Sequence, residues 1–266
     1  MILDMTQAIQ REVYYTGRFY ENDVPNLIWQ VVREGDAFID IGANVGHISL
    51  FAARRIGRNG RIIAFEPNPC TRAFLWMHKV ANDLDMLEIR EEAIGDCDAT
   101  AELHLNPTNR GECTLRSISG SHTMRVPMIR GAILDTQLEQ MRPAIVKIDV
   151  EGYEYRVLKG LGPFLERREL LVVLEMTDCW LRDLGGSAQE LVRFMEVRGF
   201  TCLTVRCCRS IRRPNELSLL PLAECTGRDS QMNVCFVREG TRMHARVVPF
   251  IKHARPTKLP GEAMPS

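Results

Sequence analysis

The sequence predicts an α/β protein built on a mostly parallel sheet with helices on both faces. Three observations lead to this prediction. Short apolar, β-branched runs alternate with amphipathic segments of helical period from Asp36 to about Val237. Two helical segments end at a glycine, Gly57 and Gly199, which is a common way for a helix to stop. With 266 residues, 45% of them hydrophobic, the chain can bury one sizeable core.

The predicted elements follow one another as strand and helix units. We expect strands at 37–42, 61–67, 86–94, 144–150, 170–176, 200–205 and 233–237. Helices are expected at 45–57, 71–84, 154–166 and 187–199. Between the third and fourth strands the alternation lapses, and 101–106 and 125–129 are predicted as strands around the polar loop 107–123. A loop of this length is either disordered or a lid over a site.

Three parts of the chain are expected. Residues 1–35 form an N-terminal helical region, 36–238 form the main domain with a β-rich insert at about 99–130, and 239–266 form a basic, proline-containing tail. The net charge is zero, but from residue 201 onward eleven basic residues face five acidic ones. Without interleaved aromatic residues, such a bias favours a solvated face over a nucleic-acid surface.

Composition argues against several other classes. No stretch approaches the ~18 to 20 apolar residues that a membrane helix needs. The first fifteen residues contain an acid, Asp4, and no cationic segment before an apolar core, so a secretory signal is not expected and a cytoplasmic location is the default. Nine cysteines, an odd number without paired spacing, favour reduced thiols over disulfides or structural zinc.

An acid and two glycines stand where the first strand gives way to a helix, in Asp40-Ile-Gly42-Ala-Asn44-Val-Gly46. In an open parallel sheet this turn is the usual ligand anchor. Gly42 lets the backbone approach a ligand, and Gly46 allows a tight entry to the helix. The middle glycine of the dinucleotide fingerprint is missing, which argues against a pyrophosphate and an NAD-dependent oxidoreductase. Asp40 and Asn44 instead suit a ligand with an amine and a carboxylate; a purely structural turn is the alternative.

Glu66 closes the second predicted strand at close to the ~20-residue spacing from Gly42 at which a carboxylate accepts hydrogen bonds from a ribose. Together the two signals predict a nucleoside-containing ligand. The fourth strand carries Lys147, Asp149 and Glu151 at alternate positions, along one face where buried charge needs partners. Asp149 is the best candidate to face a reaction site. The alternative is an internal Lys147–Asp149 ion pair, with Glu151 capping the next helix.

Four segments then make the sequence familiar: FIDIGANVGHISLFAARRIG, RIIAFEPNP, AIVKIDVEGYEYRVLKG and LLVVLEM. In this order and spacing they resemble the FkbM-type family of S-adenosylmethionine-dependent methyltransferases over about residues 36–238. The resemblance implies a class I methyltransferase (Rossmann-like) fold, with a seven-stranded sheet whose seventh strand runs antiparallel beside the fifth. It also implies methyl transfer to a hydroxyl oxygen of a sugar, macrolide or similar small molecule.

Carried over residue by residue, the resemblance assigns the cofactor site. The methionine part would be held by Asp40, Gly42, Asn44 and Gly46, the ribose by Glu66, and the adenine by Glu92, Ala93 and Ile94. Cys113 stands in a polar segment of the insert where the family commonly has a serine.

Methyl transfer to an alcohol calls for in-line alignment and a general base, because the hydroxyl loses its proton as the new bond forms. Asp149 is the first candidate base, and Glu175 and His47 are alternatives; Glu151 and Lys147 are expected beside the substrate. Asp149 and Glu175 together could hold a divalent cation, but nothing in their spacing requires one, so no metal site is predicted.

Two other functions stay open. A methyltransferase acting on nucleic acid or protein would suit the basic C-terminal region, but the chain lacks an N-P-P-Y or D-P-P-Y segment. A non-catalytic protein could keep the same fold as a cofactor-binding or scaffold module. The acceptor and the oligomeric state cannot be read from the sequence.

Overall fold

The computed structural model describes residues 22–106, 113–141, 143–208, 216–222 and 231–252, together with Arg11, Tyr14 and Tyr15. Most of the predicted N-terminal region, residues 107–112 of the polar loop and the tail after Lys252 therefore lie outside the described residues. None of the helices in the described ranges is long and apolar enough to cross a membrane.

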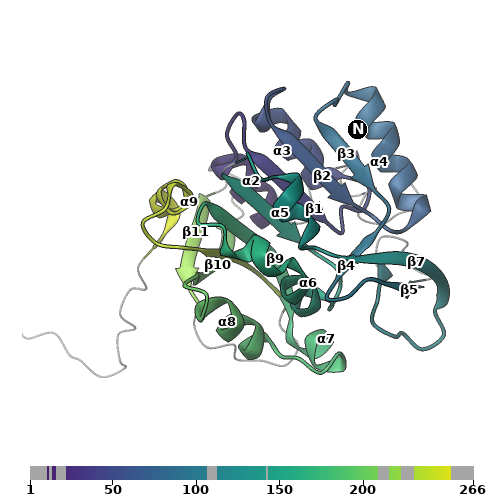
Figure 1. Cartoon of the computed structure of the whole chain (residues 1–266). Helices are drawn as coiled ribbons and strands as arrows, with labels where there is room; N and C mark the ends of the chain where they lie inside the picture. The colour runs from purple at the N-terminus through teal and green to yellow at the C-terminus, as the bar shows by residue number, and fades with distance from the viewer. Residues whose placement is uncertain are drawn as a thin grey trace, which may run out of the picture.

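An eight-stranded sheet forms the centre of the protein, in the order β11-β10-β12-β9-β8-β1-β2-β3 (Figure 1). These strands are β1 (Ala37–Ile41), β2 (Arg61–Phe65), β3 (Leu87–Arg90), β8 (Ala144–Ile148), β9 (Leu170–Thr177), β10 (Thr201–Cys208), β11 (Glu216–Pro221) and β12 (Gln231–Val237). Strands β3, β2, β1, β8 and β9 run parallel, and β12 runs antiparallel beside β9. This is the strand order of the class I methyltransferase fold, as expected.

The expected number of seven strands was wrong by one. The additional strand, β11, pairs antiparallel with β10 at the edge of the sheet. It ends at Pro221, and a proline in a short apolar run is a weak signal for a strand because it cannot donate to the ladder. An edge position tolerates it.

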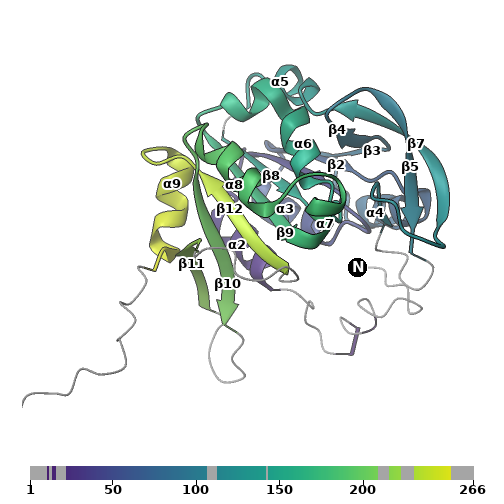
Figure 2. The ribbon, with the colours of Figure 1, turned by 90° about the horizontal axis from the view of Figure 1, so that it is seen from below.

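The third predicted strand, 86–94, divides between two sheets. Strand β3 ends at Arg90, and β4 (Ala93–Gly95) pairs with β7 (His122–Arg130) in a second sheet of order β4-β7-β5-β6. Both strands predicted around the polar loop are present, as β5 (Ala99–Leu105) and β7, with the short β6 (Cys113–Thr114) between them. Figure 2 shows β5 and β7 beyond the β3 end of the main sheet.

Helices cover both faces of the main sheet (Figure 1). One core lies under α2 (Asp23–Val31), α3 (His47–Ile56), α4 (Pro69–Ala81) and α9 (Arg242–Val247). The other lies under α5 (Ile133–Gln137), α6 (Glu154–Leu161), α7 (Asp178–Asp183) and α8 (Ala188–Glu196). Two 3-10 turns, η1 (Gly162–Glu166) and η2 (Val248–Phe250), follow α6 and α9.

Every residue of β1 and β8 is buried, which is typical of parallel strands covered on both faces. Alternate side chains divide between the cores, so Phe38 packs under α2 and α3 and Ile39 packs toward α6. After the last strand, Met243 and Val247 of α9 are fully buried beside α2, so the packed unit extends past Val237. The carboxyl ends of the parallel strands are consequently held rigidly next to one another.

Candidate functional site

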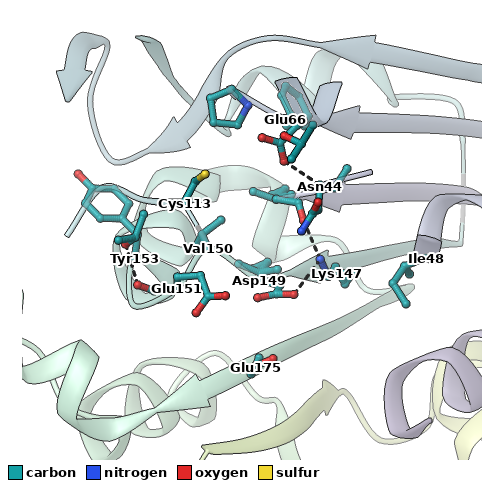
Figure 3. A pocket seen from close by; sticks show the side chains of 18 of the residues that line it. Asn44, Ile48, Glu66, Cys113, Lys147, Asp149, Val150, Glu151, Tyr153 and Glu175 are labelled. Carbon is teal, nitrogen blue, oxygen red and sulfur yellow. Dashed lines mark hydrogen bonds and ion pairs between the residues drawn. The ribbon is translucent and has the colours of Figure 1, made fainter. Parts of the chain in front are cut away.

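A cavity of about 440 Å³ lies at the carboxyl ends of the parallel strands (Figure 3). Its walls come from the turn after β1, the ends of β2, β8 and β9, strands β4 and β6 of the second sheet, and the start of α2. This is where ligands bind in open α/β sheets.

The turn after β1 lines the cavity and has a left-handed backbone at Gly42 (φ 76°) and Asn44 (φ 52°). A Cβ added to Gly42 would lie 1.9 Å from the carbonyl oxygen of Asp149. Only glycine therefore lets the turns after β1 and β8 meet. The close approach that the sequence predicts at this glycine is an approach to the neighbouring turn.

Glu66 lies at the end of β2 with only 6% of its surface exposed (Figure 3). Its carboxylate accepts hydrogen bonds from the backbone N–H groups of Asn44 (2.7 Å) and Asn68 (2.8 Å). Burial raises the pKa of Glu66, while these amides and the Thr71 hydroxyl oppose that shift by favouring the charged form. Because a carboxylate offers about four acceptor positions, capacity remains for hydroxyl groups of a ligand.

Asp40, in contrast, does not line the cavity. It is fully buried, with one oxygen accepting a bond from the Ser49 hydroxyl (2.7 Å) and the other lying 3.4 Å from Nζ of Lys147. Nζ of Lys147 also donates to the Gly42 carbonyl (2.9 Å) and lies 3.3 Å from Asp149. Burial opposes the charge of Lys147, but Asp149 and Asp40 outweigh it and raise its pKa. The charge of Asp40 thus compensates that of Lys147 in the core. The internal Lys147–Asp149 ion pair considered from the sequence is also present.

Three carboxylates that the sequence singled out, Asp149, Glu151 and Glu175, line the same cavity (Figure 3). The side chain of Asp149 is 35% exposed and faces the cavity beside Lys147. Glu151 has a left-handed backbone (φ 54°), and its carbonyl accepts a bond from the Thr114 hydroxyl (2.7 Å), which ties β6 to this turn. Glu175 accepts a bond from the Gln231 amide. Among the described residues, no group of three His, Cys, Asp or Glu side chains is placed to hold a metal ion.

The split third strand supplies the opposite wall. Glu92, Ala93 and Ile94, the segment expected at an adenine, all line the cavity. The guanidinium of Arg90 bonds both carboxylate oxygens of Glu92, at 2.7 and 3.1 Å, and lowers the pKa of Glu92. The charge of Glu92 is thus engaged by Arg90, and Ala93 and Ile94 beside it are apolar.

The comparison with known families decides the family of this chain. The model of the methyltransferase FkbM domain matches residues 40–202, which is more than half of the chain. The chain belongs to the FkbM methyltransferase family. It is therefore a methyltransferase by family.

This FkbM methyltransferase is similar to two curated relatives and one solved structure. The 31-O-demethyl-FK506 methyltransferase FkbM of Streptomyces tacrolimicus is 30% identical, over 73% of this chain and 82% of the relative. The hexuronic acid methyltransferase AglP of Haloferax volcanii is 27% identical, over 58% of this chain and 61% of AglP, so the match spans about three fifths of that relative. A crystal structure of the FkbM methyltransferase of Methylobacillus flagellatus covers 88% of this chain and 60% of its own, at 12% identity and a TM-score of 0.46.

Besides Asp40, two predicted site residues of this FkbM methyltransferase differ from what the sequence led us to expect. Gly46 precedes α3 outside the cavity lining, and a Cβ there would lie 2.2 Å from Leu75 of α4, so it serves helix packing. His47 does line the cavity, but burial and then the neighbouring His78 lower its pKa to about 4. A neutral imidazole with that pKa is a weak base at neutral pH, which disfavours His47 as the general base.

Sequence reasoning missed other lining residues, among them Tyr153, Trp180, Gln231 and Asn233. Tyr153 lies in the segment AIVKIDVEGYEYRVLKG, one residue before the predicted helix, and nothing there marked it as a site residue. Trp180 lies on α7, a six-residue helix that is too short for a periodic pattern to predict. Asn233 enters through the antiparallel pairing of β12 with β9, opposite Glu175. That pairing has no local signal in the sequence.

Proposed function

We propose that this methyltransferase uses S-adenosylmethionine to methylate a hydroxyl oxygen of a sugar or similar small molecule. The observation that carries the proposal is the buried carboxylate of Glu66, which lies in the cavity within hydrogen-bonding distance of the Asn44 amide. A buried acid with acceptor capacity at this strand end suits the hydroxyl groups of a ribose. The names of the two curated relatives point the same way, since one acts on a hexuronic acid and the other on a demethylated FK506.

The described residues fit the cofactor as a whole. Gly42 and Asn44 would face its methionine part, Glu66 its ribose, and Ala93 and Ile94 its adenine. When bound, the cofactor supplies a methyl group on a sulfonium that already carries its leaving group. The remaining work of the protein is to orient the acceptor, exclude water and take up the proton of the alcohol.

Asp149 is the group we assign to that proton. It follows β8, faces the cavity and has 35% of its side chain exposed. Lys147 lies 3.3 Å from one of its oxygens and fixes the direction of the carboxylate. Glu151 and Glu175 line the same wall and would accept hydrogen bonds from other hydroxyls of the acceptor.

The cofactor is tested by calorimetric titration with S-adenosylhomocysteine and, as a control, with NAD. We expect binding of the first compound only. Glu66→Ala should weaken it by about 1 to 3 kcal/mol, the scale of a lost charge-assisted hydrogen bond. Glu91→Ala is the matched control, because Glu91 lies outside the cavity with its side chain 66% exposed. Equal affinity in wild type and Glu66→Ala would remove Glu66 from the site.

The base is tested with radiolabelled S-adenosylmethionine and a panel of neutral glycosides, uronic acids and macrolides. For whichever acceptor is methylated, Asp149→Asn should lower kcat by about 10²-fold or more, the usual scale of general base catalysis. Its affinity for S-adenosylhomocysteine should stay within about threefold of wild type. A variant with full kcat would reject Asp149 as the base, and transfer only to nucleic acid or protein would reject the small-molecule acceptor.

A further inference from the structure

The turn between β8 and α6 is a strained segment that carries much of the acceptor side of the cavity. Asp149, Val150, Glu151 and Tyr153 from this turn all line the cavity. Its backbone is left-handed at Glu151 (φ 54°) and again at Gly152 (φ 105°). A left-handed conformation costs a non-glycine residue about 1 to 2 kcal/mol, so something nearby must hold it in place.

A buried acid beneath the turn supplies that hold. Glu154 is 2% exposed, does not line the cavity and begins α6. Its Oε1 accepts hydrogen bonds from the backbone N–H groups of Gly152 (3.0 Å) and Val150 (3.2 Å). A helix cap would point its oxygen forward to the N–H groups of the first helical turn. Glu154 reaches backward instead, across the residue with the left-handed backbone.

The opposite side of the turn is closed as well. A Cβ on Gly152 would lie 2.9 Å from Cβ of Trp180, and the Thr114 hydroxyl bonds the Glu151 carbonyl. Trp180 of α7 and Thr114 of β6 therefore contact the turn on one side, and the Glu154 carboxyl binds it on the other. Trp180 leaves no room for the turn to move toward α7, and the two bonds to Glu154 restrain it from the other side.

The second carboxyl oxygen of Glu154 takes no part in these hydrogen bonds. Oε2 is buried and has no hydrogen-bond partner among the described residues. Burial, with a further contribution from Asp149, raises the pKa of Glu154 to about 7. Because Oε1 can accept the two bonds whether the carboxyl is charged or neutral, the hold on the turn does not require a second charge beside Asp149.

We propose that Glu154 is a positioning residue, whose buried carboxyl holds the turn 149–153 so that Asp149 and Glu151 face the acceptor. This inference rests on the proposed methyl transfer for its functional consequence, but its structural part can be measured without an acceptor. Since Asp149 would take the proton, Glu151 would bind the acceptor and Glu154 would act only through them, the loss of Glu154 should leave cofactor binding unaffected.

The test compares Glu154→Leu, which removes the acceptor oxygen at similar volume, with Glu154→Gln, which keeps a neutral acceptor. Ser187→Ala is the matched control, because Ser187 caps α8 away from the cavity. Amide hydrogen exchange is followed at Val150 and Gly152, and S-adenosylhomocysteine affinity by calorimetry. In Glu154→Leu we expect both amides to exchange at least tenfold faster, with the dissociation constant within threefold of wild type. Glu154→Gln and Ser187→Ala should match wild type at both amides.

With an acceptor from the panel above, Glu154→Leu should lower kcat at least tenfold with KM for S-adenosylmethionine unchanged, and Glu154→Gln should restore kcat. Unchanged amide exchange or unchanged kcat in Glu154→Leu would overturn the inference, as would an equal loss of kcat in Glu154→Gln. If wild type binds no S-adenosylhomocysteine, the proposed function fails, and the amide exchange alone still decides whether Glu154 holds the turn.

Discussion

Replacing Lys147 with methionine tests whether the buried carboxylate of Asp40 depends on the charge of Lys147. Lys147 is held between the fully buried Asp40 and the partly exposed Asp149. Methionine fills similar space without charge, so Lys147→Met would leave Asp40 ionised in the core with only the Ser49 hydroxyl as a described side-chain partner. Removing one partner of a buried ion pair typically costs about 3 to 5 kcal/mol. Asp149 adds little to that cost, because water can solvate its carboxylate.

We therefore expect Lys147→Met to lose about 3 kcal/mol or more of unfolding free energy in urea titrations at neutral pH. The matched control is Lys159→Met, since Lys159 is 40% exposed and lies 3.8 Å from Asp96. A surface pair of this kind contributes at most about 1 kcal/mol. The double variant Asp40→Asn with Lys147→Met should recover part of the loss, because it removes the unpaired charge.

A loss below about 1 kcal/mol in Lys147→Met, or a double variant no more stable than the single one, would refute this reasoning. Either result would mean that Asp40 is not held as a charged group that depends on Lys147.

Two further predictions concern the turns beside the cavity. Gly42→Ala should strongly reduce both the melting temperature and S-adenosylhomocysteine binding, because its Cβ would meet the Asp149 carbonyl at 1.9 Å. Gly120→Ala is the control, since Gly120 has a similar φ of 75° but open space around it, and it should lower the unfolding free energy by only about 1 kcal/mol. Glu154→Gln should change how stability depends on pH. The native state keeps a proton that the unfolded chain loses, since the pKa of Glu154 is raised from 4.5 to about 7. Wild type should therefore lose about 3 kcal/mol relative to Glu154→Gln in urea unfolding between pH 5 and pH 8, at ~1.36 kcal/mol per pH unit. Parallel stability curves for the two proteins would contradict this.

That Gly42 and Glu66 share one wall of the cavity could be predicted from the sequence, because that wall is built from local turns at the ends of neighbouring strands. Gly42 and Glu66 each end a strand that the pattern reveals, and a parallel sheet brings such ends together. The interpretation failed where a side chain has a long-range partner. Asp40 stands in the same motif, yet its carboxylate points to Lys147, which is more than a hundred residues away in sequence.

The rest of the cavity wall depends on pairings that no local pattern encodes. The segment 86–94 has the composition of one strand, but β4 leaves the main sheet to pair with β7. Asn233 reaches the cavity through the pairing of β12 with β9, and Trp180 through a short helix after Glu175. Glu154 was part of a motif, but its role as an acceptor for the turn became visible only from the burial of its carboxyl.

The charge balance around Lys147 also distinguishes its two carboxylates. Without Asp149, Lys147 would still be paired with the buried Asp40 and bonded to the Gly42 carbonyl. Without Asp40, Lys147 would retain only a partner that is 35% exposed, and a buried ammonium would lose most of its compensation. The fold therefore needs Asp40 more than Asp149. A carboxylate that faces the cavity and that the fold can lose is available for chemistry, which is why Asp149→Asn should reduce turnover while the protein remains folded.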